Sequence, residues 1–322
     1  LHSATMVKAG VSLVGRLAPA FAATAGWRPL VLTTGVVTMV FGGLRALRQV
    51  DLKLLLAYGT VSQLGFLIVL GGTGTQVAAA AMIGTLLAHG FFKSTLFLTV
   101  GVIDHQTGTR SIAALTGIGR RMPVLAGAGA LAAASMAGLP PLIGFVGKEA
   151  ALEAFLPGHV PAPSPAAAGV MLAGLVVGSI LTFAYSARFV WGAFADKETV
   201  SERRFQSPSW AFVTAPVLLS AAGLLLGVAP QAADAVAQSY AAPLPVGDKP
   251  YHLALWHGFG PTLGLTALVI AAGALLFAAR RTVEQAQKAL ARWPEAELGY
   301  HLFVHAIYAA ALSVTRRLQR GT

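Results

Sequence analysis

The sequence predicts an all-α fold, a polytopic transmembrane helical bundle with about eight to nine spans. Hydrophobic residues make up 56% of its 322 residues and charged residues only 11%, against about 25% charged residues in ordinary soluble proteins. Apolar runs near the ~20 residues that a helix needs to cross a bilayer recur along the chain. Lysines and arginines gather in the short connections between these runs, as in the cytoplasmic loops of membrane proteins.

The net charge of +11 does not indicate a nucleic-acid partner, because no basic strip with interleaved aromatic residues is present. The absence of cysteine excludes disulfides, thiolate metal sites and cysteine nucleophiles. The chain begins at Leu1 without a methionine. We therefore expect a fragment with sequence missing on both sides.

Apolar segments define the expected helices in order. Pro19 is expected to end the first, and a charged corner at Asp51 precedes the third. A polar loop is expected at 104–121. The predicted segments up to this break are 1–18, 30–47, 54–70, 77–103 and 122–140.

An irregular region follows, where Pro140-Pro141 interrupts the helical pattern. We predict that 144–194 forms one discontinuous crossing, with a half helix, a proline-rich link at 158–165 and a longer helix. Broken helices of this kind line binding sites in transporters. The alternative is a short re-entrant or interfacial helix at the outer surface.

The C-terminal part contains two more apolar spans, at 210–228 and 257–279, joined by a polar loop. The charged segment 282–298 is predicted to be an amphipathic surface helix. The short apolar segment 302–314 is either a final span or an interfacial helix.

The lysines and arginines assign the orientation of these spans. One side of the bundle receives fourteen of them and the other only three, Arg16, Arg28 and Lys249, so the first side is predicted to be cytoplasmic. The fourteen are Arg45, Arg48, Lys53, Arg110, Arg120, Arg121, Arg188, Lys197, Arg203, Arg204, Arg280, Arg281, Lys288 and Arg292.

Three lysines lie within or beside apolar helices: Lys8, Lys93 and Lys148. Ionisable residues at membrane depth are costly and usually mark a pathway for ions or protons. His89 stands four residues before Lys93 and shares its helix face, and histidine can relay protons near neutral pH. The alternatives are lysines that snorkel to an interface and a histidine satisfied by packing.

Other polar residues are weaker candidates. Lys53 with Asp51 is an interfacial ion pair or a helix-start charge. Glu149 and Glu153 are candidate partners for Lys148 or for a neighbouring subunit. Asp104 and His105 are a candidate loading site at the cytoplasmic end, or simply a solvated helix end. No metal-ligand spacing, phosphate loop or nucleophile–base pair is present, so we expect no cofactor and no enzymatic activity.

Four stretches resemble the antiporter-like subunits shared by respiratory complex I and Mrp-type cation/proton antiporters. They are Leu1-His2-Ser3-Ala4-Thr5-Met6-Val7-Lys8-Ala9-Gly10-Val11, then Asp51-Leu52-Lys53 with residues 57–65, then His89-Gly90-Phe91-Phe92-Lys93, and finally Gly144-Phe145-Val146-Gly147-Lys148-Glu149. The stretch 101–110 is most similar to the large A subunit of Mrp-type Na⁺/H⁺ antiporters.

The resemblance implies inverted five-helix repeats, each with a broken helix, and protons that move along a central line of lysines, histidines and water. It places Lys8 and His2 in the broken helix of the first repeat, Lys93 at the centre and Lys148 at the end. Thr85 stands where many relatives have a second histidine, so more of the relay would depend on His89.

We expect three regions: 1–50, the truncated end of the first repeat; 51–229, the second repeat; and 230–322, the C-terminal helices. The expected function is proton translocation in a hetero-oligomeric Na⁺/H⁺ antiporter of the plasma membrane, with H⁺, Na⁺, the other subunits and the bilayer as partners and no nucleic acid. One alternative is the same fold in complex I or a membrane-bound hydrogenase. The other is a structural scaffold that holds partner subunits.

Overall fold

The computed structural model describes residues 5–156, 165–197, 208–246, 250–290 and 296–318. The chain divides into two compact units, Leu1–Ala278 and Ala279–Thr322. All regular secondary-structure elements in the described residues are helices. The β-structure among these residues is one isolated bridge between Asp51 and Ser111. The prediction of an all-α bundle is confirmed.

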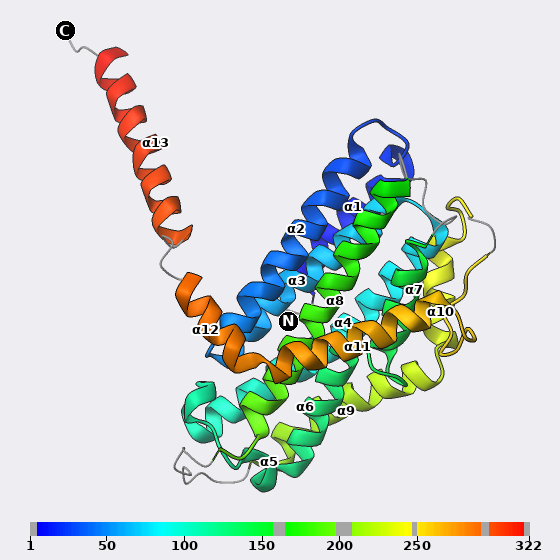
Figure 1. The fold of residues 1–322 in the computed structure, drawn as a ribbon, viewed down its shortest axis with the longest axis vertical. Helices are drawn as coiled ribbons and strands as arrows, with labels where there is room; N and C mark the ends of the chain where they lie inside the picture. Colours follow the sequence, from blue (N-terminus) through cyan, green and yellow to red (C-terminus); the bar gives the residue numbers. More distant parts are fainter. Residues whose placement is uncertain (1–4, 157–164, 198–207, 247–249, 291–295, 319–322) are drawn as a thin grey trace. The chain divides into compact units, whose positions relative to one another are not determined.

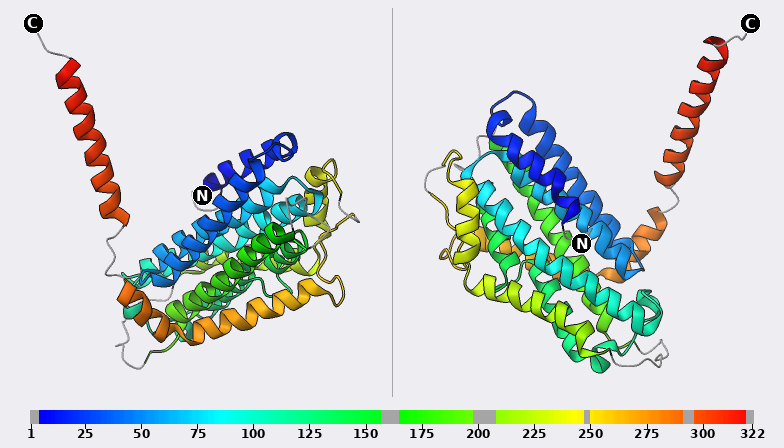
Figure 2. Two further views of the ribbon diagram at one scale, coloured as in Figure 1. Left: turned by 45° about the horizontal axis from the view of Figure 1, so that its top comes forward. Right: turned by 180° about the vertical axis from the view of Figure 1, so that it is seen from behind.

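In chain order the first unit contains η1 (Met6–Lys8), α1 (Ala9–Phe21), α2 (Trp27–Arg48), α3 (Leu52–Thr73), α4 (Gln76–Thr107), η2 (Ile112–Ala114), α5 (Ile118–Arg121), α6 (Pro123–Ala137), α7 (Ile143–Glu153), α8 (Pro165–Phe194), α9 (Trp210–Val228), α10 (Gln231–Ala241) and α11 (Pro261–Ala278). The second unit contains α12 (Arg280–Leu290) and α13 (Ala296–Leu318). In the first unit, α2, α3 and α8 lie side by side along one direction, whereas α11 crosses them obliquely in the view of Figure 1; Figure 2 gives two further views.

Six helices in the described part of the chain are long and apolar enough to cross a membrane: α2, α3, α4, α8, α9 and α11. Large apolar side chains project outward from several of them, including Leu30 on α2, Leu218 on α9 and Leu275 on α11. In a membrane such side chains contact lipid, which explains their exposure. The predicted total of about eight to nine spans stays a prediction.

Close helix contacts establish the direction of each element. Gly35 of α2 lies against Val69 of α3, and Gly42 lies against Ser62, so these two helices are antiparallel. Gly71 of α3 contacts Met82 of α4, whereas Lys93 of α4 bonds to Leu56 of α3, so α3 and α4 are also antiparallel. Two such reversals make α2 and α4 run in the same direction.

The helix α8 follows that same direction, because Gly174 meets Val36 and Gly178 meets Met39 along α2. In contrast, α6 and α7 are both antiparallel to α4. Gly129 of α6 lies against Thr99, and Gly147 of α7 lies against Thr85. The pair α6–α7 therefore forms one broken path along α4, and α7 and α8 run in opposite directions.

This arrangement corrects the predicted crossing 144–194. A discontinuous helix is present, but its break lies at 138–142, between α6 and α7, and α8 is long enough to cross a membrane by itself. The link at 158–164 lies outside the described residues. The interfacial alternative is also wrong, since every residue of α7 from Ile143 to Leu152 is buried.

The chain geometry explains the break. Gly138 ends α6 with a φ of 85°, a left-handed conformation that favours glycine. The chain then returns so closely that a Cβ on Gly144 would overlap the carbonyl oxygen of Ser135. Only a residue without a side chain allows α7 to begin beside the last turn of α6.

Smaller predictions also need correction. The first helix of the described residues extends through Pro19 to Phe21 rather than ending at Ala18, because Pro19 lies in its last turn. The connection between 228 and 257, predicted as a polar loop, contains α10, an eleven-residue helix with three buried alanines on one face. The C-terminal segments 282–298 and 302–314 correspond to the two helices α12 and α13, and residues 291–295 between them lie outside the described part.

At the predicted cytoplasmic end, the side chain of Lys197 folds back onto the protein backbone. Its ammonium donates to the carbonyl oxygens of Ile112, Leu115 and Gly192 at 2.7–2.8 Å. Burial lowers the pKa of this lysine to about 8. The end of α8 is thereby joined to the turn η2.

We predict that Gly144→Ala destabilises the folded protein by about 1–3 kcal/mol, because the new methyl group overlaps a backbone oxygen that cannot move aside. The measurement is the thermal unfolding of the purified complex in detergent. Gly127→Ala on α6 is the matched control, since a Cβ there meets nothing within 4 Å. Equal stability of the two variants would contradict the close approach of α6 and α7.

Candidate functional site

One face of α4 carries the polar residues at the centre of the bundle. Thr85, His89 and Lys93 follow each other at four-residue spacing and are all buried. At 1.5 Å per residue they cover about 12 Å of the helix axis. The other two lysines predicted from the sequence, Lys8 and Lys148, approach this same stretch of α4 from neighbouring elements.

Lys93 is fully buried and directed toward α3. Its ammonium donates to the carbonyl oxygen of Leu56 at 3.1 Å. Gly59 makes room for it, since a Cβ there would lie 3.3 Å from the Lys93 nitrogen and 3.1 Å from the ring of Tyr185. A backbone oxygen is thus the hydrogen-bond acceptor for the central lysine.

Lys8 stands at the start of α1 and reaches across to α4, where its ammonium donates to the carbonyl oxygen of Leu86 at 3.0 Å. Only 8% of Lys8 is exposed. The snorkelling alternative is therefore wrong for Lys8, because its charged end is enclosed by protein. Lys8 and Lys93 are both within electrostatic reach of His89.

Lys148 lies on α7 and is 7% exposed, so it does not snorkel either. Its ammonium donates to the carbonyl oxygen of Ala137 at 3.0 Å, at the last residue of α6. The final carbonyls of a helix lack helical partners and carry a partial negative charge, so this end stabilises a cation. The break in the crossing therefore supplies the acceptor for Lys148, and Gly138 leaves room for the lysine stem.

The three lysines share one property: in the described residues, no ion pair joins any of them to a carboxylate. Each has a neutral backbone carbonyl as its acceptor. A carboxylate partner would hold the ammonium form strongly, whereas a carbonyl allows the lysine to lose its proton. This arrangement suits groups that must exchange protons.

His89 and Thr85 lie between these lysines. Both ring nitrogens of His89 and the hydroxyl of Thr85 are buried without a hydrogen-bond partner among the described residues. The alternative of a histidine satisfied by packing thus gains no hydrogen bond among the described residues, and its ring contacts Phe92 edge-on at 5.4 Å. Buried polar atoms are expected to have partners, and water is the usual one in a polar interior.

The sequence analysis missed a second polar cluster next to Lys93. Tyr185 of α8 is fully buried, and its hydroxyl lies 3.2 Å from Gln63 and 3.3 Å from Thr182. The Tyr185 hydroxyl also donates to the Gly59 carbonyl at 3.4 Å. These residues show no charge in the sequence, and their contacts join helices far apart along the chain, so no sequence signal indicated them.

The candidates at the predicted cytoplasmic end are not part of this centre. Asp51 caps α3 by accepting from the backbone N–H groups of Lys53 and Leu54, at 2.7 and 3.1 Å. Arg110 pairs with Asp51 at 3.2 Å and with Asp104 at 3.6 Å. Of the two interpretations of Asp51 and Lys53, the structure supports a charge at the helix start. His105 packs beside the ring of Phe212.

The acidic residues of α7 bond to α11 and not to Lys148. Glu149 accepts from Thr266 at 2.8 Å, and Glu153 accepts from Thr262 at 2.5 Å. The two glutamates are four residues apart on α7, and the two threonines are four residues apart on α11. This matching spacing was the available sequence signal. His2 lies outside the described residues. In the described part, no group of three histidine or acidic side chains could hold a metal ion.

These features define a polytopic membrane protein with protonatable side chains enclosed in its helical bundle. The family described as the NADH:quinone oxidoreductase/Mrp antiporter transmembrane family matches residues 1–181, and the chain belongs to this family.

Comparison with individual proteins shows which members of the family this chain resembles. The A subunit of the Na(+)/H(+) antiporter of Alkalihalophilus pseudofirmus is 37% identical over 303 residues, which cover 86% of this chain and 38% of the relative. The structure of the Mrp complex from Dietzia sp. DQ12-45-1b matches with a TM-score of 0.86 and 38% identity, over 99% of this chain and 34% of that chain. Respiratory complex I from Thermus thermophilus matches with a TM-score of 0.61 and 27% identity, over 74% of this chain and 50% of that chain. The chain thus spans less than two fifths of its curated relative.

We predict that Asp51→Ala lowers the free energy of unfolding by about 1 kcal/mol through loss of the helix cap, while leaving ion exchange by the assembled complex unchanged. Thermal unfolding and transport in vesicles would be measured together. Lys53→Ala serves as the control, because the Lys53 side chain is exposed and its backbone N–H alone meets Asp51. A transport defect in Asp51→Ala with normal stability would show that this residue belongs to the ion pathway.

Proposed function

We propose that this chain is a proton-translocating membrane part of a multisubunit Na⁺/H⁺ antiporter of the plasma membrane. The observation that carries the proposal is the set of three buried lysines, each with a backbone carbonyl as acceptor, around a buried histidine whose ring nitrogens have no hydrogen-bond partner in the described residues. Such groups at membrane depth are characteristic of proton relays. The name of the curated relative, the A subunit of a Na(+)/H(+) antiporter, supports the choice of ions and of partner subunits.

In the proposed pathway, protons move across the bundle from one lysine to the next through His89 and water. An ammonium that gives up its proton leaves a neutral amine, which removes the cost of a buried charge. His89 accepts on one ring nitrogen and donates from the other. Thr85 cannot carry the charge, but its hydroxyl can hold a water molecule between His89 and α7.

A redox-driven machine such as complex I or a membrane-bound hydrogenase is the first alternative. The match to complex I is weaker in identity and in coverage of this chain than the match to the Mrp complex, which favours the antiporter. Copurification of flavin or iron–sulfur subunits with this chain would favour the alternative. The chain is not proposed to be an enzyme, since its central residues lack a nucleophile–base pair.

The second alternative is a scaffold that only holds partner subunits. It requires the buried lysines to tolerate an apolar side chain of similar length, as replacing a buried charge by a hydrophobic residue is often neutral for stability. The two hypotheses therefore differ in what happens to transport when a lysine loses its charge and the complex still assembles.

We predict that Lys93→Ala abolishes sodium-dependent proton movement in everted vesicles while the complex still assembles. Lys93→Met keeps the side-chain volume and removes the ionisable group, so it separates chemistry from packing. Proton movement would be followed with a pH-sensitive dye after sodium addition, and assembly by native gel electrophoresis.

The matched control is Lys53→Met, the same change at an exposed lysine. It should leave exchange unchanged. Normal exchange in both Lys93 variants would remove this residue from the pathway and support the scaffold.

We further predict that Thr85→Val slows exchange by about tenfold, because a methyl group replaces the hydroxyl that orients water in a proton-transfer path. The two side chains have nearly the same shape, so the close contact with Gly147 is preserved. Exchange rates per assembled complex would be compared with wild type. An unchanged rate would mean that protons pass from His89 without help from Thr85.

A further inference from the structure

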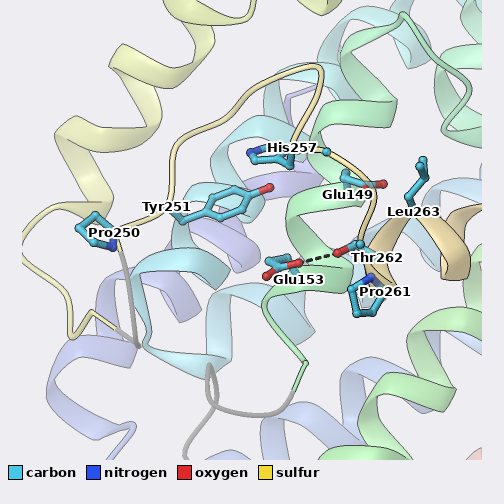
Figure 3. A pocket seen from close by; sticks show the side chains of 10 residues that line it. Glu149, Glu153, Pro250, Tyr251, His257, Pro261, Thr262 and Leu263 are labelled. Atoms are coloured by element: carbon cyan, nitrogen blue, oxygen red, sulfur yellow. Dashed lines mark hydrogen bonds between the residues drawn. The ribbon is translucent and has the colours of Figure 1, made fainter.

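A cavity of about 430 Å³ lies at the end of α7 that faces away from the predicted cytoplasmic side. Figure 3 shows its wall, with Glu149 and Glu153 on α7, Tyr251 and His257 on the connection before α11, and Thr262 at the start of α11. The centre described above does not include this cavity. One of its carboxylates, Glu149, is nevertheless the residue after Lys148 in the chain.

The two carboxylates of the cavity differ in their exposure to solvent. Glu149 is 6% exposed and bonds to Thr266, whereas Glu153 is partly exposed and bonds to Thr262. Because α7 and α11 are antiparallel, these two hydrogen bonds lie one helical turn apart along the pair. Glu149 is thus the inner group and Glu153 the outer group of one path.

The connection 250–260 contains no helix, yet it reaches into the depth of the bundle. Its Leu253 is buried, and a Cβ on Gly84 of α4 would lie 2.9 Å from the Leu253 side chain. Gly84 is next to Thr85 and also lies near Gly147. Irregular backbone at membrane depth occurs only where it is buried in protein or lines a water-filled cavity, so the cavity is expected to hold water.

Asp234 of α10 holds this connection in place. Its carboxylate accepts from the backbone N–H of Leu253 at 2.7 Å and lies 2.9 Å from the His252 ring. This pair lies outside the cavity lining. It supports the wall without facing Glu149 or Glu153.

His257 lies on the connection before α11, at the solvent-exposed side of the cavity. Its Nε2 lies 3.0 Å from the carbonyl oxygen of His252, which only accepts hydrogen bonds, so Nε2 carries a hydrogen and Nδ1 is the acceptor nitrogen. The ring stacks on Tyr251 at 4.9 Å and is exposed to solvent. The cavity is therefore lined by both an exposed histidine, His257, and a partly exposed carboxylate, Glu153.

We propose that this cavity is the outer port of the proton path, in which His257 and Glu153 collect protons from the outside medium and Glu149 passes them through water toward Lys148. The proposal rests on the proposed function and names the site where that path meets the medium. The ligand is a hydrated proton. Each transfer moves one proton between a nitrogen or carboxylate oxygen and water, and no other bond changes.

The test uses the complete antiporter complex in everted vesicles, where the cavity faces the lumen. The variants are Glu149→Gln, Glu153→Gln and His257→Gln, each close in shape to the original. We expect Glu149→Gln to slow exchange by about 100-fold and the two outer variants by about tenfold, as for the loss of a proton-transfer group.

The dependence on lumenal pH separates proton collection from a structural role. The defect of the two outer variants should be largest at about pH 8 and shrink toward about pH 6, because proton collection limits the rate when protons are scarce. Asp196→Asn is the control, since that carboxylate pairs with Arg120 at the opposite end. It should match wild type at every pH.

Three results would overturn the proposal. The first is an unchanged rate in Glu149→Gln. The second is a defect in the outer variants that is equal at all lumenal pH values. The third is a changed half-saturating Na⁺ concentration without a change in pH dependence, which would assign the cavity to the metal cation. If Lys93→Met loses exchange and the cavity variants do not, the proposed function survives and only the port is wrong.

Accessibility provides a second measurement that does not depend on transport rates. The chain has no cysteine, so Leu263→Cys places a single thiol in this chain at the cavity wall. A membrane-impermeant maleimide added to intact cells should label it and block exchange relative to the unmodified complex. A thiol that resists labelling from outside in an assembled complex would exclude an outward opening.

Discussion

The cost of burying an ammonium group in a membrane bundle shapes this protein. Three lysines are enclosed, and in the described residues none has a carboxylate partner. Each is stabilised instead by a backbone carbonyl, at Leu86, Leu56 or Ala137. A carbonyl offsets part of the lost hydration and yet does not lock the charge in place, as an ion pair would. Close packing of α4 with α3, α7 and the start of α1 is needed to bring these carbonyls within reach.

The break between α6 and α7 follows from the same constraint. A continuous helix would bond its own carbonyls and offer no acceptor to Lys148. By stopping at Gly138 and restarting beside Ser135, the chain leaves the negative end of α6 facing the ammonium. The restart also directs Glu149 and Glu153 toward α11. One interruption of the backbone therefore serves both the lysine and the cavity beyond it.

Residues near each other in the chain were predictable, and those brought together by packing were not. The spacing of His89 and Lys93 placed them on one buried face because a helix repeats every 3.6 residues. The crossing 144–194 was assigned wrongly, because hydropathy measures apolar length but not direction. Only the contacts of Gly129 and Gly147 with α4 reveal that α6 and α7 form the broken path. Tyr185 with Gln63, and the threonines of α11, also required the tertiary structure.

The sequence by itself determined the membrane class, the helical fold, the family resemblance and the buried lysines. These depend on composition, local periodicity and short motifs, which the chain carries in each segment. The tertiary structure decided what each lysine contacts, where the crossing is broken and which carboxylates face the outer cavity. Hydrogen bonds such as that from Lys93 to Leu56 join separate helices, and their existence depends on how the helices pack. No local pattern specifies that packing, because an apolar helix surface can contact lipid or another helix at similar free energy.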